Sequence, residues 1–399
     1  LQPMYNNIFK LENSTLTAGV PSEQQKAHYP RLKRRKDGGV ILFYQGGTQS
    51  SRIFTMNASS FNSLKTATPK IILTPYKDTG LTAKYAALTG KSSIVYQRYM
   101  NMDAVVMPDG EIIAVAQHHA WDYKEVGYYK GEGTAIVLMR SKDGGNTWTS
   151  PKEIYSGTSW EPYLLLLPDG TLQMYFTDSD PFLYSSQTSI MTSVDKGESW
   201  SEKKVVARQY KYPYNGPNTD YTGQNVYTDQ MPCFRLLNDG KTLVGFLEGR
   251  HEKENSDGTV TTYHKMSLIT NNGTDWSAIT GNSQNALPST RQTNKMSGTG
   301  GYVETFPSGE TLISCSSNGP FLIKLLDNRC TVSDGVMNIG NTWDADKWFR
   351  PFDGIGVWGS MERYDDNMLM ATSSTVWWSS TFVSPVHFSS RSNLPCLAN

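Results

Sequence analysis

The chain has 399 residues, and 37 Lys and Arg side chains balance 37 Asp and Glu side chains. With no net charge, it has no overall field to attract nucleic acid or an anionic membrane, and both are excluded as partners. The longest apolar run, YLLLL at residues 163–167, is far shorter than the roughly 18 residues of a membrane span, which predicts a soluble protein.

The cysteines and the first residue bear on the compartment. Cys233, Cys315, Cys330 and Cys396 lie far apart without a CxxC pair, which argues against a zinc site. Cys315 and Cys330 either pair in an oxidising compartment or remain free buried thiols. The chain begins at Leu1 rather than Met, which favours a trimmed product with a secreted, periplasmic or cell-surface location.

Six segments in chain order share one pattern: an apolar strand, a tight turn of the Asp-Gly kind, and a second strand rich in β-branched and aromatic residues. The turns fall at Asp37, Asp109, Asp169, Asp239, Ser308 and Asp366. Their spacing of about 60 to 70 residues is typical of a four-stranded blade with long loops. Helical periodicity is nearly absent. The pattern predicts an all-β, six-bladed β-propeller that forms a single domain over residues 1–399, in preference to two packed β-sandwiches.

A second turn motif follows these hairpins. SKDGGNTW at residues 141–148 and SVDKGESW at residues 193–200 are near copies, TNNGTDW at residues 270–276 is degenerate, and GNTW at residues 340–343 is a remnant. A recurring element is expected to stabilise blades, with the Asp accepting backbone N–H bonds and the Trp packing between sheets. The two near copies resemble the Asp-box, S-x-D-x-G-x-[ST]-W, and the chain therefore resembles the sialidase-like propellers.

Hairpin geometry predicts where a functional site lies. If the Asp-Gly turns share one end of the axis, the residues that begin the first strand and end the second lie at the opposite rim. Strand starts contribute Arg31, Arg98, Asp103, Glu161, Asp229 and Gln230, and strand ends contribute Gln45, His118, His119, Asp178, Asp180, Glu248 and Arg250.

Two of these rim carboxylates suit glycoside hydrolysis. Glu161 follows Trp160, and Glu248 ends an apolar strand near Arg250. Apolar neighbours raise the pKa of a carboxyl group, whereas an Arg keeps it ionised, and two such groups across a sugar ring are what the reaction requires. The alternative is that both belong to a structural ion-pair network at the rim.

A further resemblance rests on YPRL at residues 29–32, WEP at residues 160–162, DQMP at residues 229–232 and FLEG at residues 246–249. These segments are similar to blade starts and ends in the exo-α-1,5-L-arabinanases of glycoside hydrolase family 93. The resemblance implies that Glu161 and Glu248 are the catalytic pair. We predict Glu161 as the nucleophile and Glu248 as the acid/base, with the reverse assignment left open. The longer segment at residues 210–227 departs from the family pattern and leaves the polysaccharide open.

Two other functions remain open. A sialidase would use three arginines, for which Arg31, Arg98, Arg250 and Arg363 are candidates. However, YPRL replaces the Arg-Ile-Pro of those enzymes, and Trp358 stands where their nucleophilic Tyr is expected. The second alternative is a carbohydrate-binding propeller without turnover.

The remaining candidates concern substrate contacts. His118 and His119 are adjacent on a strand and face opposite sides, which argues against joint metal ligation, and no metal or cofactor is predicted. Aromatic loops over the rim are expected to restrict attack to chain ends, through Trp121, Tyr123, Tyr128, Tyr129, Tyr214 and Tyr221, although packing that orders long loops is the alternative.

The sequence thus predicts an exo-acting, monomeric glycoside hydrolase acting on an oligo- or polysaccharide. The residues expected to bind substrate are Arg31, Arg98, Asp103, His118, Trp160, Asp178, Asp229, Gln230 and Arg250.

Overall fold

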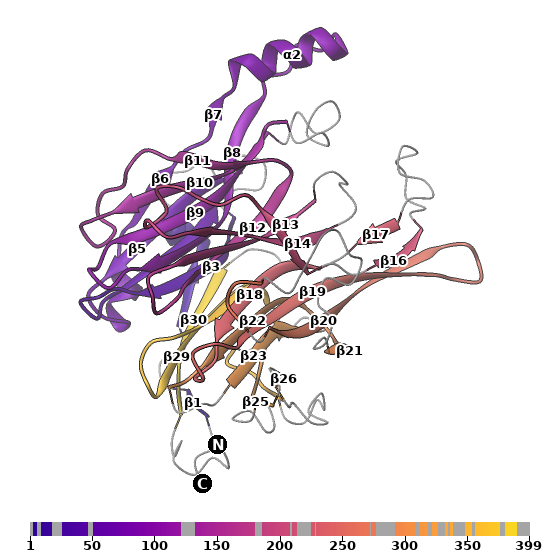
Figure 1. Ribbon diagram of the computed structural model, residues 1–399. Helices are drawn as coiled ribbons and strands as arrows, with labels where there is room; N and C mark the ends of the chain where they lie inside the picture. The colour runs from indigo at the N-terminus through magenta and orange to yellow at the C-terminus, as the bar shows by residue number, and fades with distance from the viewer. Residues whose placement is uncertain are drawn as a thin grey trace.

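The strands form antiparallel sheets arranged around an axis in a computed structural model of the chain (Figure 1). The structure describes residues 3–5, 9–17, 26–46, 51–120, 132–179, 186–207, 210–213, 225–227, 229–271, 273–276, 292–307, 311–317, 321–325, 332–333, 336–337, 348–352, 356–375 and 380–388.

The first three sheets follow one another along the chain. One contains β3 (Ala27–Arg34), β4 (Val40–Gly46), β5 (Arg52–Ala58) and β6 (Pro69–Leu73). The next contains β7 (Tyr76–Lys77), β8 (Tyr96–Val106), β9 (Ile112–His119), β10 (Thr134–Ser141) and β11 (Lys152–Ser156). The third contains β12 (Ser159–Leu166), β13 (Leu172–Asp178), β14 (Gln187–Ser193) and β15 (Lys204–Ala207).

The later sheets repeat this order. One contains β18 (Gln230–Leu236), β19 (Leu243–Glu254), β20 (Val260–Asn271) and β21 (Gln292–Ser297), and another β22 (Thr299–Thr305), β23 (Thr311–Ser316), β24 (Phe321–Leu325) and β27 (Trp348–Phe349). The last contains β28 (Gly356–Arg363), β29 (Met368–Thr375) and β30 (Ser380–Phe388). Two short hairpins are separate from these sheets. β16 (Tyr210–Pro213) pairs with β17 (Asn225–Tyr227) between two sheets of the chain order, and β25 (Val332–Ser333) pairs with β26 (Val336–Met337) between β24 and β27.

In each sheet the first strand of the Asp-Gly hairpin lies nearest the axis. These strands contact one another in the order β3, β8, β12, β18, β22 and β28, and β28 in turn contacts β3. The N-terminal strands β1 (Pro3–Tyr5) and β2 (Phe9–Glu12) pair with β30, so the two ends of the described chain share one sheet. The closed order of contacts makes the molecule a β-propeller.

Second strands are buried along their length because neighbouring sheets cover both of their faces. All of β4 (VILFYQG) and all of β9 (IIAVAQHH) are buried. A strand in this position is a continuous apolar run rather than an alternating one. The polar residues at its end are therefore buried at the rim.

The predicted Asp-Gly turns are confirmed at Asp37, Asp109, Asp169 and Asp239. In each, the carboxylate accepts the N–H of the residue two positions later, at 2.9–3.0 Å. The following glycine has a φ between 72° and 94°, which strongly favours glycine. In the last hairpin the acceptor is Asp365 rather than Asp366, because the Asn367 N–H donates to Asp365 at 2.7 Å. Ser308 lies outside the described residues.

Three helical segments were not predicted. The helix α2 (Thr79–Thr89) lies between β7 and β8 and projects at the top of Figure 1. Asp78 caps it by accepting the Leu81 N–H, and Gly90 ends it with a φ of 71°. Its apolar residues do not gather on one side, so periodicity gave no signal. The other segments are α1 (Asn13–Leu16) and the 3-10 helix η2 (Asn62–Thr66).

The SKDGGNTW turn links the outer strands β10 and β11, as predicted. Asp143 accepts the Ser141 hydroxyl and the Thr147 N–H, both at 2.8 Å. The Trp148 indole N–H donates to the Gly145 carbonyl at 3.2 Å, and its ring meets Phe43 of the preceding sheet.

SVDKGESW repeats these bonds through Ser193, Asp195, Ser199 and Trp200 between β14 and β15. In the degenerate copy, buried Trp276 donates to the Tyr175 hydroxyl at 3.0 Å. The GNTW remnant lies outside the described residues. These hydrogen bonds lie within the turns and stabilise them, which is the structural role predicted from the sequence.

Each inner strand also contains a β-bulge near its start. The pairing register shifts between His28/Arg31, Met100/Asp103, Trp160/Tyr163, Gln230/Cys233, Thr299/Tyr302 and Val357/Ser360. Within the bulges, φ is between 49° and 60° at Tyr29, Asn101, Glu161, Met231, Gly300 and Trp358. A left-handed bulge redirects one side chain out of the regular alternation. The bulges therefore determine what faces the axis at the rim.

Candidate active site

A cavity of about 230 Å³ opens at the rim of the propeller. Its residues lie at or beside the bulges, at the end of each hairpin away from the Asp-Gly turn. They are His28, Tyr29, Gln45, Ser51, Arg98, Met100, Asn101, Trp160, Glu161 and Trp358. The cavity therefore lies where the hairpin geometry predicted a site.

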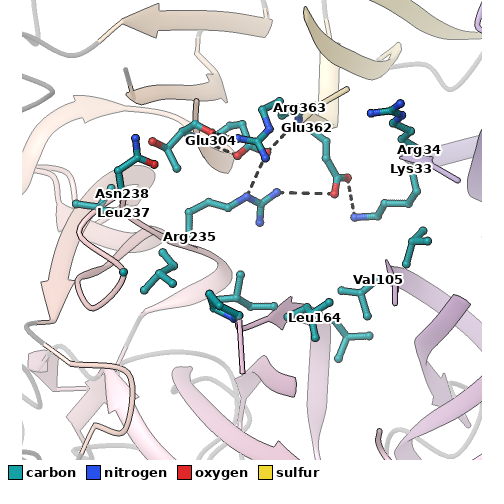
Figure 2. A pocket seen from close by; sticks show the side chains of 17 residues that line it. Lys33, Arg34, Val105, Leu164, Arg235, Leu237, Asn238, Glu304, Glu362 and Arg363 are labelled. Atoms are coloured by element: carbon teal, nitrogen blue, oxygen red, sulfur yellow. Dashed lines mark hydrogen bonds and ion pairs between the residues drawn. The ribbon is translucent and has the colours of Figure 1, made fainter. Parts of the chain in front are cut away.

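A larger cavity, of about 590 Å³, lies at the turn end of the axis (Figure 2). Its charged side chains pair with one another: Arg235 Nε lies 3.2 Å from Glu304 Oε2, and Lys33 Nζ lies 2.7 Å from Glu362 Oε2. The Glu304 carboxylate also accepts the Arg363 N–H at 3.0 Å. With its charges satisfied internally, this cavity is the weaker candidate for chemistry despite its size.

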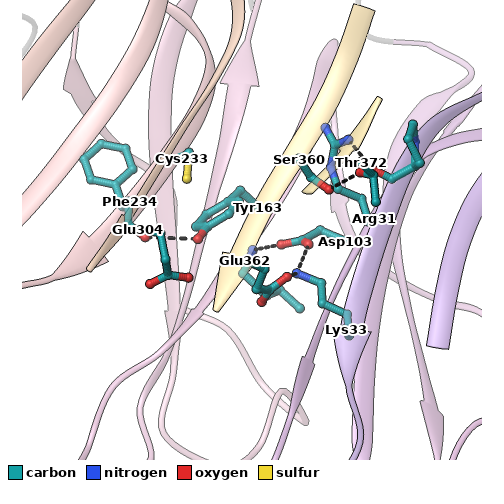
Figure 3. A network of polar contacts seen from close by, with 12 residues as sticks. Arg31, Lys33, Asp103, Tyr163, Cys233, Phe234, Glu304, Ser360, Glu362 and Thr372 are labelled. Atoms are coloured by element: carbon teal, nitrogen blue, oxygen red, sulfur yellow. Dashed lines mark hydrogen bonds and ion pairs between the residues drawn. The ribbon is translucent and has the colours of Figure 1, made fainter. Parts of the chain in front are cut away.

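A polar network continues inward from that cavity (Figure 3). Lys33 Nζ lies 2.8 Å from Asp103 Oδ1, and Asp103 Oδ2 accepts the Leu164 N–H at 2.7 Å. Asp103 is 1 % exposed. It does not line the rim cavity, so its prediction as a substrate-binding residue is not supported. The bulge that precedes it changes which side chains of β8 face the rim.

Glu161 is the carboxylate of the rim cavity. It occupies the bulge of β12 with a φ of 49°, and its Oε2 accepts the Thr177 hydroxyl at 2.5 Å. Thr177 in turn accepts the Met231 N–H at 2.7 Å. Burial raises the pKa of Glu161 to about 7, and the negative charge of Glu248 adds to the increase, while Thr177 and Arg31 oppose it.

Glu248 ends the apolar part of β19 in the neighbouring sheet and is 5 % exposed. Its Oε1 accepts the Gln230 amide at 2.9 Å and lies 2.8 Å from His264 Nδ1. Its Oε2 accepts the Gly300 N–H at 3.0 Å. The two predicted carboxylates thus lie in contrasting environments and interact electrostatically.

The position of Glu248 recurs around the rim. Gln45 and Thr177 occupy the same register position in their sheets, and each accepts the N–H of the bulge in the next sheet, as Glu248 does. Gln117 has this position in β9, opposite Met100. It is fully buried, and neither of its amide atoms has a hydrogen-bond partner among the described residues.

The predicted arginines are dispersed. Arg31 is buried and donates to the Pro30 and Trp358 carbonyls at 2.8 and 2.9 Å, with its guanidinium 3.6 Å from the Tyr29 ring centre. Arg98 lines the rim cavity, whereas Arg363 lines the cavity at the opposite end. The Arg250 side chain lies outside the described part of the chain.

Two more predicted residues face away from the rim cavity. His118 Nδ1 pairs with the Gln97 amide oxygen at 3.0 Å, and its Nε2 lies 3.5 Å from Glu153. Asp178 accepts the Ser189 hydroxyl at 2.6 Å and pairs with Lys203 at 3.1 Å. Both satisfy polar groups within their own sheets, so a role in substrate binding is not supported.

Trp160, Gln230 and Asp229 have different surroundings. Trp160 lines the cavity and packs edge-on against His119 with ring centres 4.5 Å apart. Gln230 contacts Glu248 rather than the cavity. Asp229 is fully buried, and its backbone N–H donates to the Ser186 carbonyl at 2.9 Å.

The adjacent histidines face opposite sides of their strand. His118 lies beside Gln97 and Glu153, whereas His119 packs against Trp160.

The sequence did not indicate several residues of the site. Thr177 and His264 contact the carboxylates, and His28, Asn101 and Trp358 line the cavity. A recurring position at the end of each second strand would have indicated Thr177, beside Gln45 and Glu248. The residues at the bulges share no residue type that would have revealed them.

Several predictions fall outside the described residues. These are Asp180 and the six aromatic loop residues Trp121, Tyr123, Tyr128, Tyr129, Tyr214 and Tyr221. Cys315 is a buried free thiol, and Cys330 lies outside the described residues. In the described ranges, no group of three or more His, Cys, Asp or Glu side chains could hold a metal ion. No helix there has the length and apolar character to cross a membrane.

The fold resembles solved structures over nearly its whole length. The GH93 α-L-arabinofuranosidase of Fusarium graminearum in complex with arabinobiose has 14% identity and a TM-score of 0.60, over 96% of this chain and 97% of the other. The Penicillium chrysogenum α-L-arabinanase complexed with arabinobiose has 15% identity and a TM-score of 0.57, over 97% and 98%.

A mutant of the NanB sialidase of Streptococcus pneumoniae has 10% identity and a TM-score of 0.52, over 96% of this chain and 70% of the other. No protein-family profile and no curated protein sequence matches the chain. At these identities the likeness shows a sialidase-like propeller fold, of the kind found in family 93.

Proposed function

We propose that this chain is an exo-acting glycoside hydrolase that cleaves terminal units from an arabinan-like oligo- or polysaccharide, with Glu161 and Glu248 as its carboxylate pair. The observation that carries the proposal is the contrast between the two carboxylates at one rim. One has a raised pKa and lines a cavity, and the other accepts hydrogen bonds from the Gln230 amide and the Gly300 N–H. Such a contrast separates the acid from the base in glycoside hydrolysis.

The contrast also bears on their roles. Below about pH 7 the free site favours a proton on Glu161, which suits donation to the leaving oxygen. Glu248, held by the Gln230 amide and the Gly300 N–H, is then the nucleophile or base. This is the reverse of the roles predicted from the sequence. We propose the reversed roles for this chain.

The fold supports finer proposals. The inner strands contact one another in a closed series and share a recurring bulge. Both features support six blades in a single domain over residues 1–399. The bonds of Asp143 and Asp195 support the Asp-box assignment of their turns. A secreted, periplasmic or cell-surface location and a monomeric state are proposed together with the polysaccharide substrate.

Sialidase activity is the less favoured alternative. Recognition of a sialic acid carboxylate by an arginine cluster needs several guanidinium groups around one point. Of the described residues that line the rim cavity, Arg98 is the one arginine, and Arg363 lies at the other end of the axis. A neutral terminal sugar fits these surroundings better than an anionic one.

Product analysis by mass spectrometry tests the function. Wild type and Glu161→Gln are incubated separately with linear α-1,5-arabinan and with sialyllactose. We expect arabinose or arabinobiose from wild type alone, because the amide variant can neither donate nor accept the required proton. Free sialic acid would instead identify a sialidase, and sugar binding without any product would identify a binding protein.

Chemical rescue tests the roles. With a 2,4-dinitrophenyl glycoside, the leaving group needs no acid, so loss of the acid is tolerated better than loss of the nucleophile. For a retaining reaction, we expect Glu161→Ala to retain glycoside cleavage and to form, with added azide, a glycosyl azide of retained configuration. Glu248→Ala should be inactive alone and should form the azide of inverted configuration when azide is added. The opposite result would restore Glu161 as the nucleophile.

A further inference from the structure

Asn101, which lines the rim cavity, has a side-chain hydrogen-bond acceptor without a partner among the described residues. The residue is 8 % exposed, lines the cavity that contains Glu161, and occupies the bulge of β8. Its side-chain Oδ1 is buried and has no hydrogen-bond partner among the described residues. An acceptor left unpaired at such depth destabilises the protein unless a ligand or solvent supplies the donor. The side chain is therefore a candidate recognition group.

The backbone of Asn101 is fixed from the neighbouring sheet. Its N–H donates to Gln45 Oε1 at 2.7 Å, and the Gln45 amide nitrogen pairs with His28 Nε2 at 2.8 Å. Burial lowers the pKa of His28 to about 4, so its neutral ring donates from Nδ1 to the Lys26 carbonyl, 3.0 Å away, and accepts at Nε2. This series of bonds uses both ends of the Gln45 amide and leaves Asn101 Oδ1 open.

Two other polar groups of the cavity have partners within the protein. Glu161 Oε2 accepts from Thr177, and the Gln45 amide bonds with Asn101 and His28. Trp160 and Trp358 supply apolar ring faces from β12 and β28. A ligand that suits this cavity has an apolar face for the rings and a hydroxyl group to donate to Asn101, which describes a neutral sugar.

We infer that Asn101 is a specificity-determining residue, whose Oδ1 accepts a hydrogen bond from a hydroxyl group of the terminal sugar bound beside Glu161. The inference rests on the proposed function and deepens it. A site built around a hydroxyl discriminates strongly against a substrate that lacks it, because the protein acceptor is then left unpaired. Asn101 thus selects a terminal sugar that presents a free hydroxyl at this point.

The test combines two variants with deoxygenated substrates. Asn101→Gly removes the side chain while tolerating the φ of 53°. Asn101→Asp keeps the shape, the backbone preference and an acceptor oxygen. Each protein is assayed on α-1,5-arabinotriose and on analogues lacking one hydroxyl of the terminal unit, and melting temperatures verify folding.

For wild type, we expect removal of one particular hydroxyl to lower kcat/KM about 10-fold or more. Asn101→Gly should show a similar loss with the intact substrate and no further loss with that analogue, and Asn101→Asp should retain part of the discrimination. Independent, additive losses in Asn101→Gly would overturn the inference, because side chain and hydroxyl would then not interact.

Calorimetric titration with arabinobiose separates this inference from the proposed function. If wild type hydrolyses the substrate and Asn101→Gly hydrolyses and binds it equally well, the role of Asn101 is refuted and the hydrolase proposal stands. Binding without hydrolysis that weakens in Asn101→Gly, and is restored in part by Asn101→Asp, would refute the hydrolase and support Asn101 as a recognition residue. Neither binding nor hydrolysis by a folded wild type would refute both.

Discussion

Glu161 combines a left-handed backbone with a side chain that burial keeps protonated near neutral pH. A non-glycine residue with this backbone costs roughly 1–3 kcal/mol and persists only where its surroundings require it. Here the bulges of the other inner strands show the same conformation, so it belongs to the fold. What distinguishes Glu161 is the carboxylate at that position, which faces a cavity and Glu248.

Replacement of Glu161 by Gln should change how stability depends on pH. Because the pKa of Glu161 in the folded protein, about 7, is above its ordinary value of 4.5, folded wild type binds more protons than the unfolded chain between these values. Its stability therefore falls as pH rises through this window, by on the order of 3 kcal/mol at most. The Gln variant lacks this decrease and should be the more stable protein above the window.

Urea unfolding at about pH 5 and about pH 8 measures the difference. Glu12→Gln, a change at an exposed carboxylate, is the matched control and should leave the wild-type pH dependence intact. Parallel curves for wild type and Glu161→Gln would show that Glu161 titrates normally in the folded protein.

The turns between outer strands stabilise individual sheets at the end of the axis away from the rim cavity. Asp143 accepts from Ser141 and Thr147, and these hydrogen bonds hold its pKa at about 2. Because its carboxylate is the form that accepts these bonds, Asp143 stabilises the fold above its ordinary pKa, and this contribution is lost as pH falls toward about 2.

We expect Asp143→Ala to lower the melting temperature at neutral pH while leaving kcat/KM unchanged. The difference in melting temperature from wild type should shrink under acidic conditions, where wild type also loses the carboxylate bonds. Asp257→Ala, at an exposed turn where the carboxylate accepts only from Thr259, provides a comparison. A loss of kcat/KM at an unchanged melting temperature would contradict a structural role.

Hairpins could be predicted from the sequence, whereas bulges could not. Asp37 and Gly38 belong to a turn whose geometry requires those residue types, so the turn can be predicted from the sequence. Tyr29, Asn101, Glu161, Met231 and Trp358 share a backbone conformation but no residue type. Glu161 and Glu248 could be proposed from the sequence because they flank apolar strands. Asp103 was misplaced because the unseen bulge changed which side chains face the rim.

Across the whole molecule, buried charges connect strands from different sheets. Lys33 of β3 pairs with Asp103 of β8 and Glu362 of β28, and Arg235 of β18 pairs with Glu304 of β22. Removing one partner of a buried pair leaves the other uncompensated, which costs about 3–5 kcal/mol. This network therefore couples the sheets more than it serves the rim.

Asp103→Asn should accordingly reduce the free energy of unfolding by about 3–5 kcal/mol, with KM unchanged in the protein that remains folded. Combining Lys33→Met, Asp103→Leu and Glu362→Met should recover much of the loss, because no charge is then left unpaired. Urea unfolding and initial rates measure the two effects. A raised KM at wild-type stability would reinstate Asp103 as a substrate-binding residue.

The left-handed bulges have a consequence for redesign. The residue at a bulge is held by its backbone conformation and lies outside the regular pairing of its strand, so exchanging it leaves the ladder hydrogen bonds in place. Asn101 and Trp358 are two such positions around the same cavity. A small library of variants at these two positions, restricted to residues that tolerate a positive φ, would vary sugar preference. It would not change the propeller sheets that hold Glu161 and Glu248.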